Sequence, residues 1–266
     1  MFTYCSVAIQ GALPGGDDHN GGMDAQPIRS PGPVPEGSAA GDDAPAGTVV
    51  AVRAGPVRRQ HWCGREVATA AVKHLLAGPV PLGVLGLPGD EQGDRRHHGG
   101  PDKALLAYAR EDYAAWWTEG REIPEGGFSE NLTVTGWPGA RVHAGDVFAI
   151  GEALVQVTQP RRPCRTLSDR WGMPDLVAEV QRTGRAGYYL RVLREGRIGA
   201  GDAMALVDRP GGSVSVAEIH RVMNVDRGDR VGIARVLASP ELPAPWRAQL
   251  RRRLAGAPGD APGAEA

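Results

Sequence analysis

The segment of the chain with the most chemical potential is the polar stretch from Gly89 to Lys103, GDEQGDRRHHGGPDK. It contains two adjacent histidines, His97 and His98, between acidic and basic residues. Imidazole binds metals and exchanges protons near neutral pH. Adjacent side chains of an extended segment point to opposite sides, so we expect only one of the two histidines to face a pocket. A solvated, turn-rich loop explains the same composition equally well.

A cysteine with arginine neighbours forms the second candidate. Cys164 lies in the sequence QPRRPCR, which covers residues 159–165. Nearby positive charge favours the thiolate, which is both a nucleophile and a ligand for soft metals. A small buried cysteine is the commoner case, but three neighbouring arginines argue against an inert core position. Cys63 has no such neighbours beyond His61 and Arg65, and is expected to be structural.

The third candidate is Asn131, in the turn-like sequence GGFSENL of residues 126–132. Its side-chain amide could bind a carbonyl or ring nitrogen of a ligand. Asparagine also commonly hydrogen-bonds the backbone of its own turn, and by itself the residue favours that role.

The elements that must position these residues are mostly short strands. Short apolar runs that end at Gly, Pro or Asp are typical of β-strands, and their regular spacing favours a barrel or sandwich over a doubly wound sheet. Helices are predicted at 110–118 and 175–183. The predicted strands cover residues 48–54, 80–85, 104–108, 131–135, 146–150, 154–158, 188–193 and 203–207.

The pattern changes after residue 212, where apolar residues recur at spacings of three and four. This spacing predicts three helices within residues 213–254. Residues that commonly begin helices support them. These are Ser215 for the first helix, Asp226 or Asp229 for the second, and Ser239 with Pro240 for the third.

Both ends of the chain differ from its middle. Residues 1–47 contain six acidic residues, one arginine, nine glycines and six prolines, and are predicted to be disordered together with residues 255–266. Between them lie 29 basic and 23 acidic residues, of which only Lys73 and Lys103 are lysines. The planar guanidinium group of arginine can form two hydrogen bonds to an anionic ligand, so many arginines suit such a ligand. A GC-rich gene would also contain many arginine codons.

Three scattered cysteines are too few for a disulfide framework, and no apolar run approaches the length of a membrane helix. The N-terminus lacks the basic start of a secretory signal. The sequence therefore predicts a cytoplasmic protein without a membrane partner.

Taken together, the motifs resemble the MOSC domain, in particular its YiiM-like branch. The resemblance extends over nearly all of residues 48–254 and excludes residues 1–47. It is carried by HWCGREV (61–67) with Val72 and Lys73, DRRHHGGPDKAL (94–105), GGFSENLTVTG (126–136), GDVFAIGEALVQVTQPRRPCRTL (145–167), GYYLRVL (187–193) with GAGD (199–202), and VSVAE (214–218).

The resemblance implies a mainly β fold: a MOSC-type β-barrel over residues 48–212 with a few helices, then a three-helix domain over residues 213–254. It also implies a molybdenum cofactor, with Cys164 as ligand to molybdenum. The expected reaction is reduction of small N-hydroxylated compounds, with electrons from a separate flavoprotein reductase. A homodimer is left open.

The cofactor is a large anionic pterin, so the resemblance also suggests which residues contact it. We expect His98 to deliver a proton as well as contact the cofactor. The expected contacts are Arg161 and Arg165 at the phosphate or pterin, Arg95, His97, His98 and Asn131 along the opposite wall, and Lys73.

Two other functions are compatible with the same residues. Cys164 could carry sulfur as a persulfide, in sulfur transfer or in processing of C–S bonds, because a persulfide needs the same accessible thiolate. Nucleic-acid binding is disfavoured, because cations are ordinary near the end of a helix. The arginines concerned are Arg247, Arg251, Arg252 and Arg253.

Overall fold

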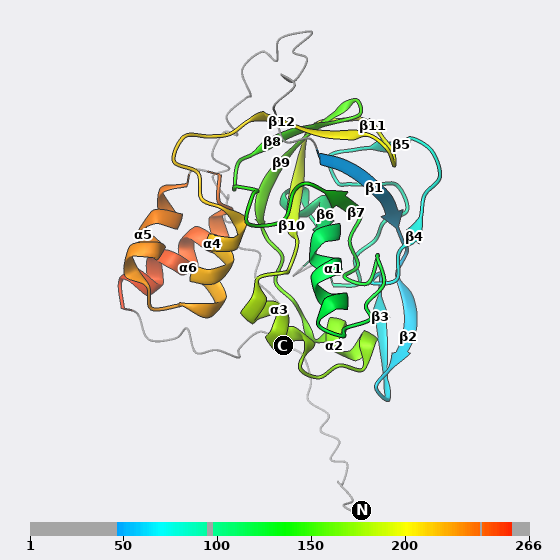
Figure 1. Ribbon diagram of the computed structural model, residues 1–266, viewed down its shortest axis with the longest axis horizontal. Helices are drawn as coiled ribbons and strands as arrows, with labels where there is room; N and C mark the ends of the chain where they lie inside the picture. Colours follow the sequence, from blue (N-terminus) through cyan, green and yellow to red (C-terminus); the bar gives the residue numbers. More distant parts are fainter. Residues whose placement is uncertain (1–46, 95–97, 240, 257–266) are drawn as a thin grey trace, which may run out of the picture. The chain divides into compact units, whose positions relative to one another are not determined.

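A closed seven-stranded barrel forms the core of the protein (Figure 1). The computed structural model describes residues 47–94, 98–239 and 241–256. The strands follow the order β12-β8-β9-β10-β6-β7-β1, and β1 pairs with β12 to close the barrel. The predicted barrel is therefore confirmed. Its strands are β1 (Gly47–Ala54), β6 (Leu105–Ala109), β7 (Leu132–Thr135), β8 (Val147–Ile150), β9 (Ala153–Pro160), β10 (Tyr188–Arg194) and β12 (Ala203–Asp208).

The strands β6 and β9 are covered on both faces; β6 is apolar throughout, whereas β9 includes the polar residues Gln156, Thr158 and Gln159. Every residue of β6 and of β9 is buried. Their inner side chains fill the barrel, where the rings of Trp137 and Phe148 lie edge to face at 4.8 Å. Their outer side chains are covered by helices and loops. Nearly continuous apolar runs of this kind are expected for strands without a solvated face.

Short peripheral strands extend from the barrel. The hairpin of β2 (Arg58–Trp62) and β3 (Arg65–Thr69) turns at Cys63 and Gly64, both with positive φ, as a two-residue hairpin turn requires. The strand β4 (His74–Leu75) pairs with β1, and β5 (Val80–Leu82) pairs with β11 (Gly196–Ile198). The sequence predicted β5 but not β2, β3, β4 or β11. These four strands are short, and they are polar or do not alternate apolar with polar residues.

Three helices lie on the outside of the barrel. They are α1 (Arg110–Thr118), α2 (Arg165–Trp171) and α3 (Leu176–Thr183), and a 3₁₀ turn, η1, covers Pro101–Lys103. The helices cover an aromatic cluster in which Tyr108 and Phe128 stack at 4.2 Å. The sequence predicted α1 and α3, whereas α2 was not predicted.

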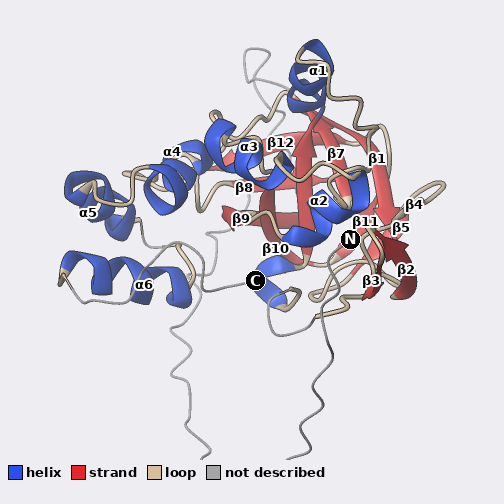
Figure 2. Ribbon diagram, turned by 90° about the horizontal axis from the view of Figure 1, so that it is seen from below, coloured by secondary structure: helices blue, strands red, loops and turns tan. Residues whose placement is uncertain are grey.

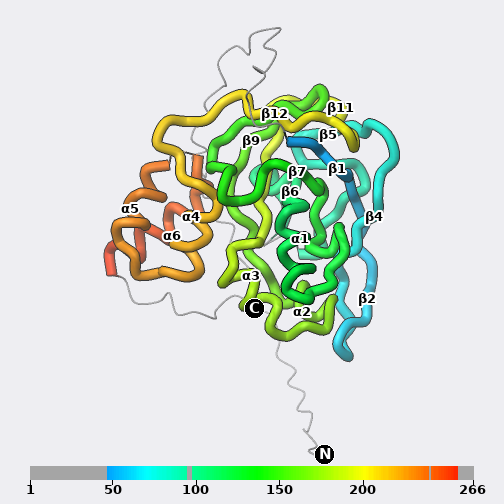
Figure 3. Tube along the Cα trace, in the orientation of Figure 1, coloured from blue at the N-terminus to red at the C-terminus, as the bar shows by residue number. Residues whose placement is uncertain are grey.

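The C-terminal helices lie together (Figures 2 and 3). Their buried side chains form a second apolar cluster, which also includes Ala144 before β8. Helix α4 (Val216–His220) continues into a π-helical turn, η2 (Arg221–Val225), and is followed by α5 (Arg230–Ala238) and α6 (Ala244–Leu254). Three helices were predicted here. The cluster contains Ala144, Val214, Ile219, Val222, Met223, Ile233, Val236, Leu242, Trp246 and Leu250.

Two of the three predicted helix starts are correct. Ser215 accepts a hydrogen bond from the Glu218 N–H and begins α4, and Asp229 accepts one from the Gly232 N–H and begins α5. The third is wrong, because Ser239 ends α5 and α6 begins at Ala244 after Pro243. Pro245 in the first turn of α6 suits a helix start, where no N–H is needed.

The predicted disordered ends lie outside the described residues, except that Gly47 is the first residue of β1 and residues 255–256 directly follow α6. Among the helices of the described ranges, none has the length and apolar character needed to span a bilayer.

Candidate functional site

Cys164 lies where the barrel strand β9 ends and helix α2 begins. It precedes α2 in an extended conformation, and its carbonyl accepts the first bond of the helix, from the Leu167 N–H at 3.0 Å. The side chain is half-buried. A rigid strand on one side and a helix start on the other therefore fix the position of this cysteine.

Opposing effects act on the Cys164 thiol. Burial raises its pKa, but a hydrogen bond from His98, the charges of Arg161 and His98, and a hydrogen bond from Thr166 together outweigh burial. The net result is a pKa of about 6, against an ordinary value of 9.0. Because neutral pH lies above this value, the sulfur is mainly a thiolate, the form that attacks electrophiles and binds soft metals.

The three arginines beside the cysteine have three different environments. Arg161 is only 6% exposed, and its Nη1 has no hydrogen-bond partner within the described part of the chain. Arg165 is largely solvent-exposed, and its Nε lies 3.5 Å from the Asp169 carboxylate. Arg162 turns toward α6 instead. The thiolate is therefore stabilised by His98 and Arg161, and not by the three arginines together, as the sequence had suggested.

Tyr189 and Lys103 also lie at this site, and sequence reasoning did not single them out. On β10, Tyr188 points into the barrel and donates to the Trp137 carbonyl at 3.1 Å, so the next residue, Tyr189, points outward. Burial raises the pKa of Tyr189, and the charges of Arg161 and Cys164 also act on it, which places its ring near both. Lys103 Nζ lies 5.7 Å from the ring centroid. The strand alternation within GYYLRVL could have indicated Tyr189.

A buried charged network lies close to Arg161. Glu130 Oε1 accepts hydrogen bonds from Tyr113 at 2.8 Å and the Gly126 N–H at 2.7 Å, and lies 3.7 Å from Arg53. Arg170 donates to the Ala71 carbonyl at 2.6 Å and interacts electrostatically with both Glu130 and Arg161. Two guanidinium groups, those of Arg53 and Arg170, thus act on the Glu130 carboxylate, and the charge of Arg161 also acts on Arg170.

Asn131 and Lys73 belong to a different network. The Asn131 amide donates to the Arg53 carbonyl at 3.1 Å and to Asp90 at 3.0 Å, and its oxygen accepts from the Leu106 N–H at 3.0 Å. Lys73 forms a buried ion pair with Asp90. Asn131 thus bonds the backbone of β1 and β6, and not that of its own turn, which its residue type alone had favoured. Contact of either residue with a cofactor stays a prediction.

Arg95 and His97, the other two predicted contacts, lie outside the described residues. Across the described ranges, no three His, Cys, Asp or Glu side chains gather into a metal-binding group.

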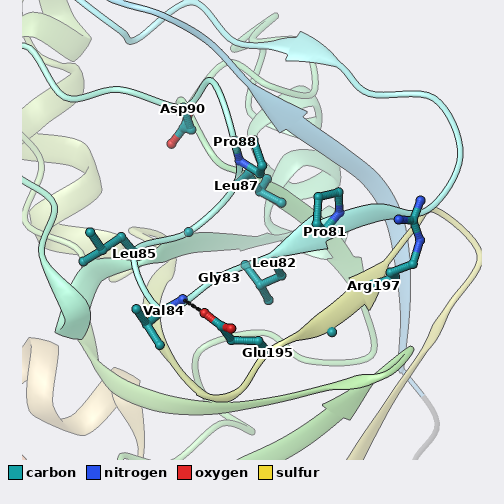
Figure 4. A pocket seen from close by; sticks show the side chains of 12 residues that line it. Pro81, Leu82, Gly83, Val84, Leu85, Leu87, Pro88, Asp90, Glu195 and Arg197 are labelled. Atoms are coloured by element: carbon teal, nitrogen blue, oxygen red, sulfur yellow. Dashed lines mark hydrogen bonds between the residues drawn. The ribbon is translucent and has the colours of Figure 1, made fainter.

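An open hollow of about 660 Å³ lies beside β5 and β11 (Figure 4). Leu82 and Leu87 form part of its wall, and Glu195 at its rim accepts a hydrogen bond from the Val84 N–H at 2.9 Å. Its lining residues include Asp90, the partner of Lys73, but neither Cys164 nor Arg161. The hollow is therefore separate from the cysteine site.

The arginines of α6 are partly fixed within the protein. Arg247 donates to the Leu242 and Ser239 carbonyls, and Arg253 donates to those of Val222 and Met223. Arg251 and Arg252 are exposed. A structural role thus accounts for two of the four arginines considered for nucleic-acid binding.

Comparison with known proteins identifies both parts of the chain. Residues 94–205 match the MOSC domain, and residues 214–257 match the YiiM-like 3-alpha helix domain. Protein YiiM of Escherichia coli is 37% identical over 196 residues, which cover 71% of this chain and 86% of that protein.

Two further relatives were found. A protein named reductase from Gibberella moniliformis is 35% identical over 182 residues, which cover 66% of this chain but only 32% of the relative. The crystal structure of YiiM from Geobacillus stearothermophilus superposes with a TM-score of 0.66 at 33% identity, covering 78% of this chain and 99% of that one. With the closed barrel and the C-terminal helices, these matches establish that the chain belongs to the MOSC family, in its YiiM-like branch.

Proposed function

We propose that this protein binds a molybdenum cofactor through Cys164 and reduces N-hydroxylated compounds. The observation that carries the proposal is the Cys164 thiolate, with a pKa of about 6, beside the charge of Arg161. The MOSC domain match and the relative named reductase add to it.

The residues present suit such a cofactor. A pterin with a terminal phosphate is anionic, and the buried guanidinium of Arg161 has an Nη1 that no described residue satisfies. Leaving a buried donor unpaired is costly, so an acceptor supplied by a ligand would stabilise this arrangement. A thiolate is also the ligand that soft metals prefer. Cys164 would hold the metal, and Arg161 would contact the anionic part of the cofactor.

The bound cofactor would supply the two-electron chemistry that breaks the N–O bond. The chain's own residues prepare for it. His98 donates a hydrogen bond to the Cys164 sulfur and so keeps it ionised. A histidine at this position is also suited to release a proton to the product. Tyr189, with Lys103 near its ring, interacts electrostatically with Cys164 and Arg161.

The electrons would come from a separate flavoprotein reductase, and the substrate would be a small N-hydroxylated molecule such as an N-hydroxylated purine. Sulfur transfer through a Cys164 persulfide is the alternative, because it needs the same thiolate.

The test uses protein produced in a host that makes the cofactor, supplied with a flavoprotein reductase and an N-hydroxylated purine. We expect the wild type and a Cys63→Ser variant to form the amine, and Cys164→Ser to lose this activity while keeping its fold by circular dichroism. Full activity of Cys164→Ser would refute the proposal. An inactive wild type that releases cyanide-labile sulfur would favour the sulfur carrier instead.

A further inference from the structure

Helix α6 contacts the segment that carries the cysteine, although the two lie far apart in sequence. Arg162 Nη2 donates to the Gln249 side-chain oxygen at 2.5 Å. The Arg162 guanidinium carbon also lies 4.8 Å from the ring centroid of Trp246. Trp246 is only 6% exposed and packs in the apolar cluster of the C-terminal helices. Arg162 is therefore held by a well-anchored part of that cluster.

The cysteine segment needs such an anchor because its backbone offers few hydrogen bonds. Pro160 and Pro163 have no N–H to donate. The Arg161 N–H donates to the Gly187 carbonyl at 3.0 Å, which ties the segment to the start of β10. Arg162 adds a side-chain tether two residues before Cys164, on the side of the C-terminal helices.

The C-terminal helices also hold the chain on the other side of α2. His220, at the end of α4, is buried, and its Nε2 lies 2.8 Å from the Gln181 carbonyl of α3. Asn224 in η2 in turn contacts the other ring nitrogen of His220 at 3.3 Å. The helices thus contact the chain before the cysteine, through Arg162, and after α2, through α3.

We propose that Arg162 is a positioning residue, through which the C-terminal helices hold Cys164 in place against His98. The hydrogen bond from His98 to the Cys164 sulfur is one of the interactions that stabilise the thiolate, beside the charge of Arg161 and the hydrogen bond from Thr166. A displacement of the segment by a fraction of an ångström weakens the bond from His98, because hydrogen bonds depend steeply on distance and angle. The C-terminal helices are then part of the working site. This inference rests on the proposed function only in taking Cys164 as the reactive atom.

The test reads the thiol itself, in the full chain without cofactor. In a Cys5→Ser, Cys63→Ser background, Cys164 is the only thiol, and its rate of alkylation by iodoacetamide is measured between pH 5 and pH 9. We expect Arg162→Ala and Gln249→Ala each to move the midpoint upward by about 0.5 pH units, which slows alkylation at pH 5 about threefold. The double variant should move it no further than Arg162→Ala alone, because Arg162→Ala already removes the contact with Gln249.

Gln249→Ala is the decisive variant, because it breaks the Arg162–Gln249 hydrogen bond and keeps both the positive charge at residue 162 and the Trp246 ring beside it. A shift in Arg162→Ala without one in Gln249→Ala would show that this hydrogen bond does not hold the cysteine segment and would overturn the proposal, as would the absence of both shifts. Arg252→Ala, an exposed change on the same helix, serves as the matched control and should leave the midpoint in place. Because no cofactor, electron donor or substrate is involved, failure here leaves the proposed function standing, and failure of the N–O reductase assay leaves this result unaffected.

Discussion

The reactivity of Cys164 depends on the two groups that act most strongly against the effect of burial on its thiol. His98 contributes both a hydrogen bond and a charge, whereas Arg161 contributes charge alone. Of the predicted site residues, sequence reasoning identified these three and assigned an equal part to Arg165, which is largely exposed. Proximity in sequence placed the arginines together, but the direction of each side chain depends on how the segment packs.

The contribution of His98 can be measured by His98→Asn, which keeps a side-chain donor and removes the titratable charge. We expect the pKa of Cys164 to rise by about one unit or more, so that alkylation at pH 6 slows about fivefold or more. The measurement is the pH dependence of alkylation in the background with Cys164 as the only thiol. His74→Asn, at an exposed position of β4, is the control. A midpoint that stays near 6 in His98→Asn would show that the histidine does not hold the thiolate.

The lowered pKa of Cys164 also makes stability depend on pH. The folded value of about 6 lies below the ordinary value of 9.0, so the thiolate stabilises the fold fully above pH 9, and this contribution is lost as the pH falls through 6. We therefore expect the free energy of unfolding of the wild type, relative to Cys164→Ser, to increase between pH 6 and pH 9. Urea unfolding with a reductant present at several pH values measures this difference. A constant difference would contradict an ionised Cys164.

Among the strands and helices, the sequence predicts best those whose structure is determined by burial of apolar side chains. The barrel strands and helices α1 and α3 follow from apolar runs and helical spacing. Helix α2 has only seven residues and follows a proline and cysteine, and the β2–β3 hairpin is largely exposed, so neither leaves an apolar pattern. The sequence also did not indicate that Tyr189 and Lys103 belong to the site. Their nearness to Cys164 depends on β10 lying between β9 and β6, which no local pattern shows.

The Lys73–Asp90 pair is predicted to be an important connection between elements. It is buried, and Asp90 also binds Asn131 and the Gly55 N–H, so it joins the ends of β1 and β7 to the loop before the histidines. Lys73→Met leaves a buried carboxylate without its cation, and we expect a loss of about 3–5 kcal/mol in the free energy of unfolding.

Arg59→Met is the matched control for Lys73→Met, since it breaks the Arg59–Glu66 pair, whose side chains are 80% and 61% exposed. Exposed pairs contribute little, so this variant should unfold at nearly the same urea concentration as the wild type. Equal losses in the two variants would contradict the assigned role of Lys73.

At the scale of the whole molecule, the fold depends on closure of the barrel between its first and last strands. Gly47 pairs with Met204, whose carbonyl accepts a hydrogen bond from the Trp137 indole at 2.9 Å. A side-chain carbon at residue 47 would lie 2.0 Å from the Trp137 ring. The sequence could predict a barrel from its strands, but this closing contact joins residues far apart in the chain and leaves no local pattern.

Gly47→Ala should therefore destabilise the protein, by about 1–3 kcal/mol, because a methyl group must displace the buried Trp137. Gly211→Ala is the control, since a side-chain carbon there has open space around it. Thermal unfolding of the two variants compares them directly. An unchanged midpoint in Gly47→Ala would show that the barrel closes differently from the structure described here.

The central claim is that Cys164 is the protein ligand of a molybdenum cofactor, and the molybdenum and pterin content of purified protein tests it most directly. The protein and its Cys164→Ser variant are produced in the same cofactor-making host. The account predicts stoichiometric molybdenum and pterin in the wild type and loss of molybdenum in Cys164→Ser. A wild type without molybdenum, or a Cys164→Ser variant that retains it in full, would contradict the claim.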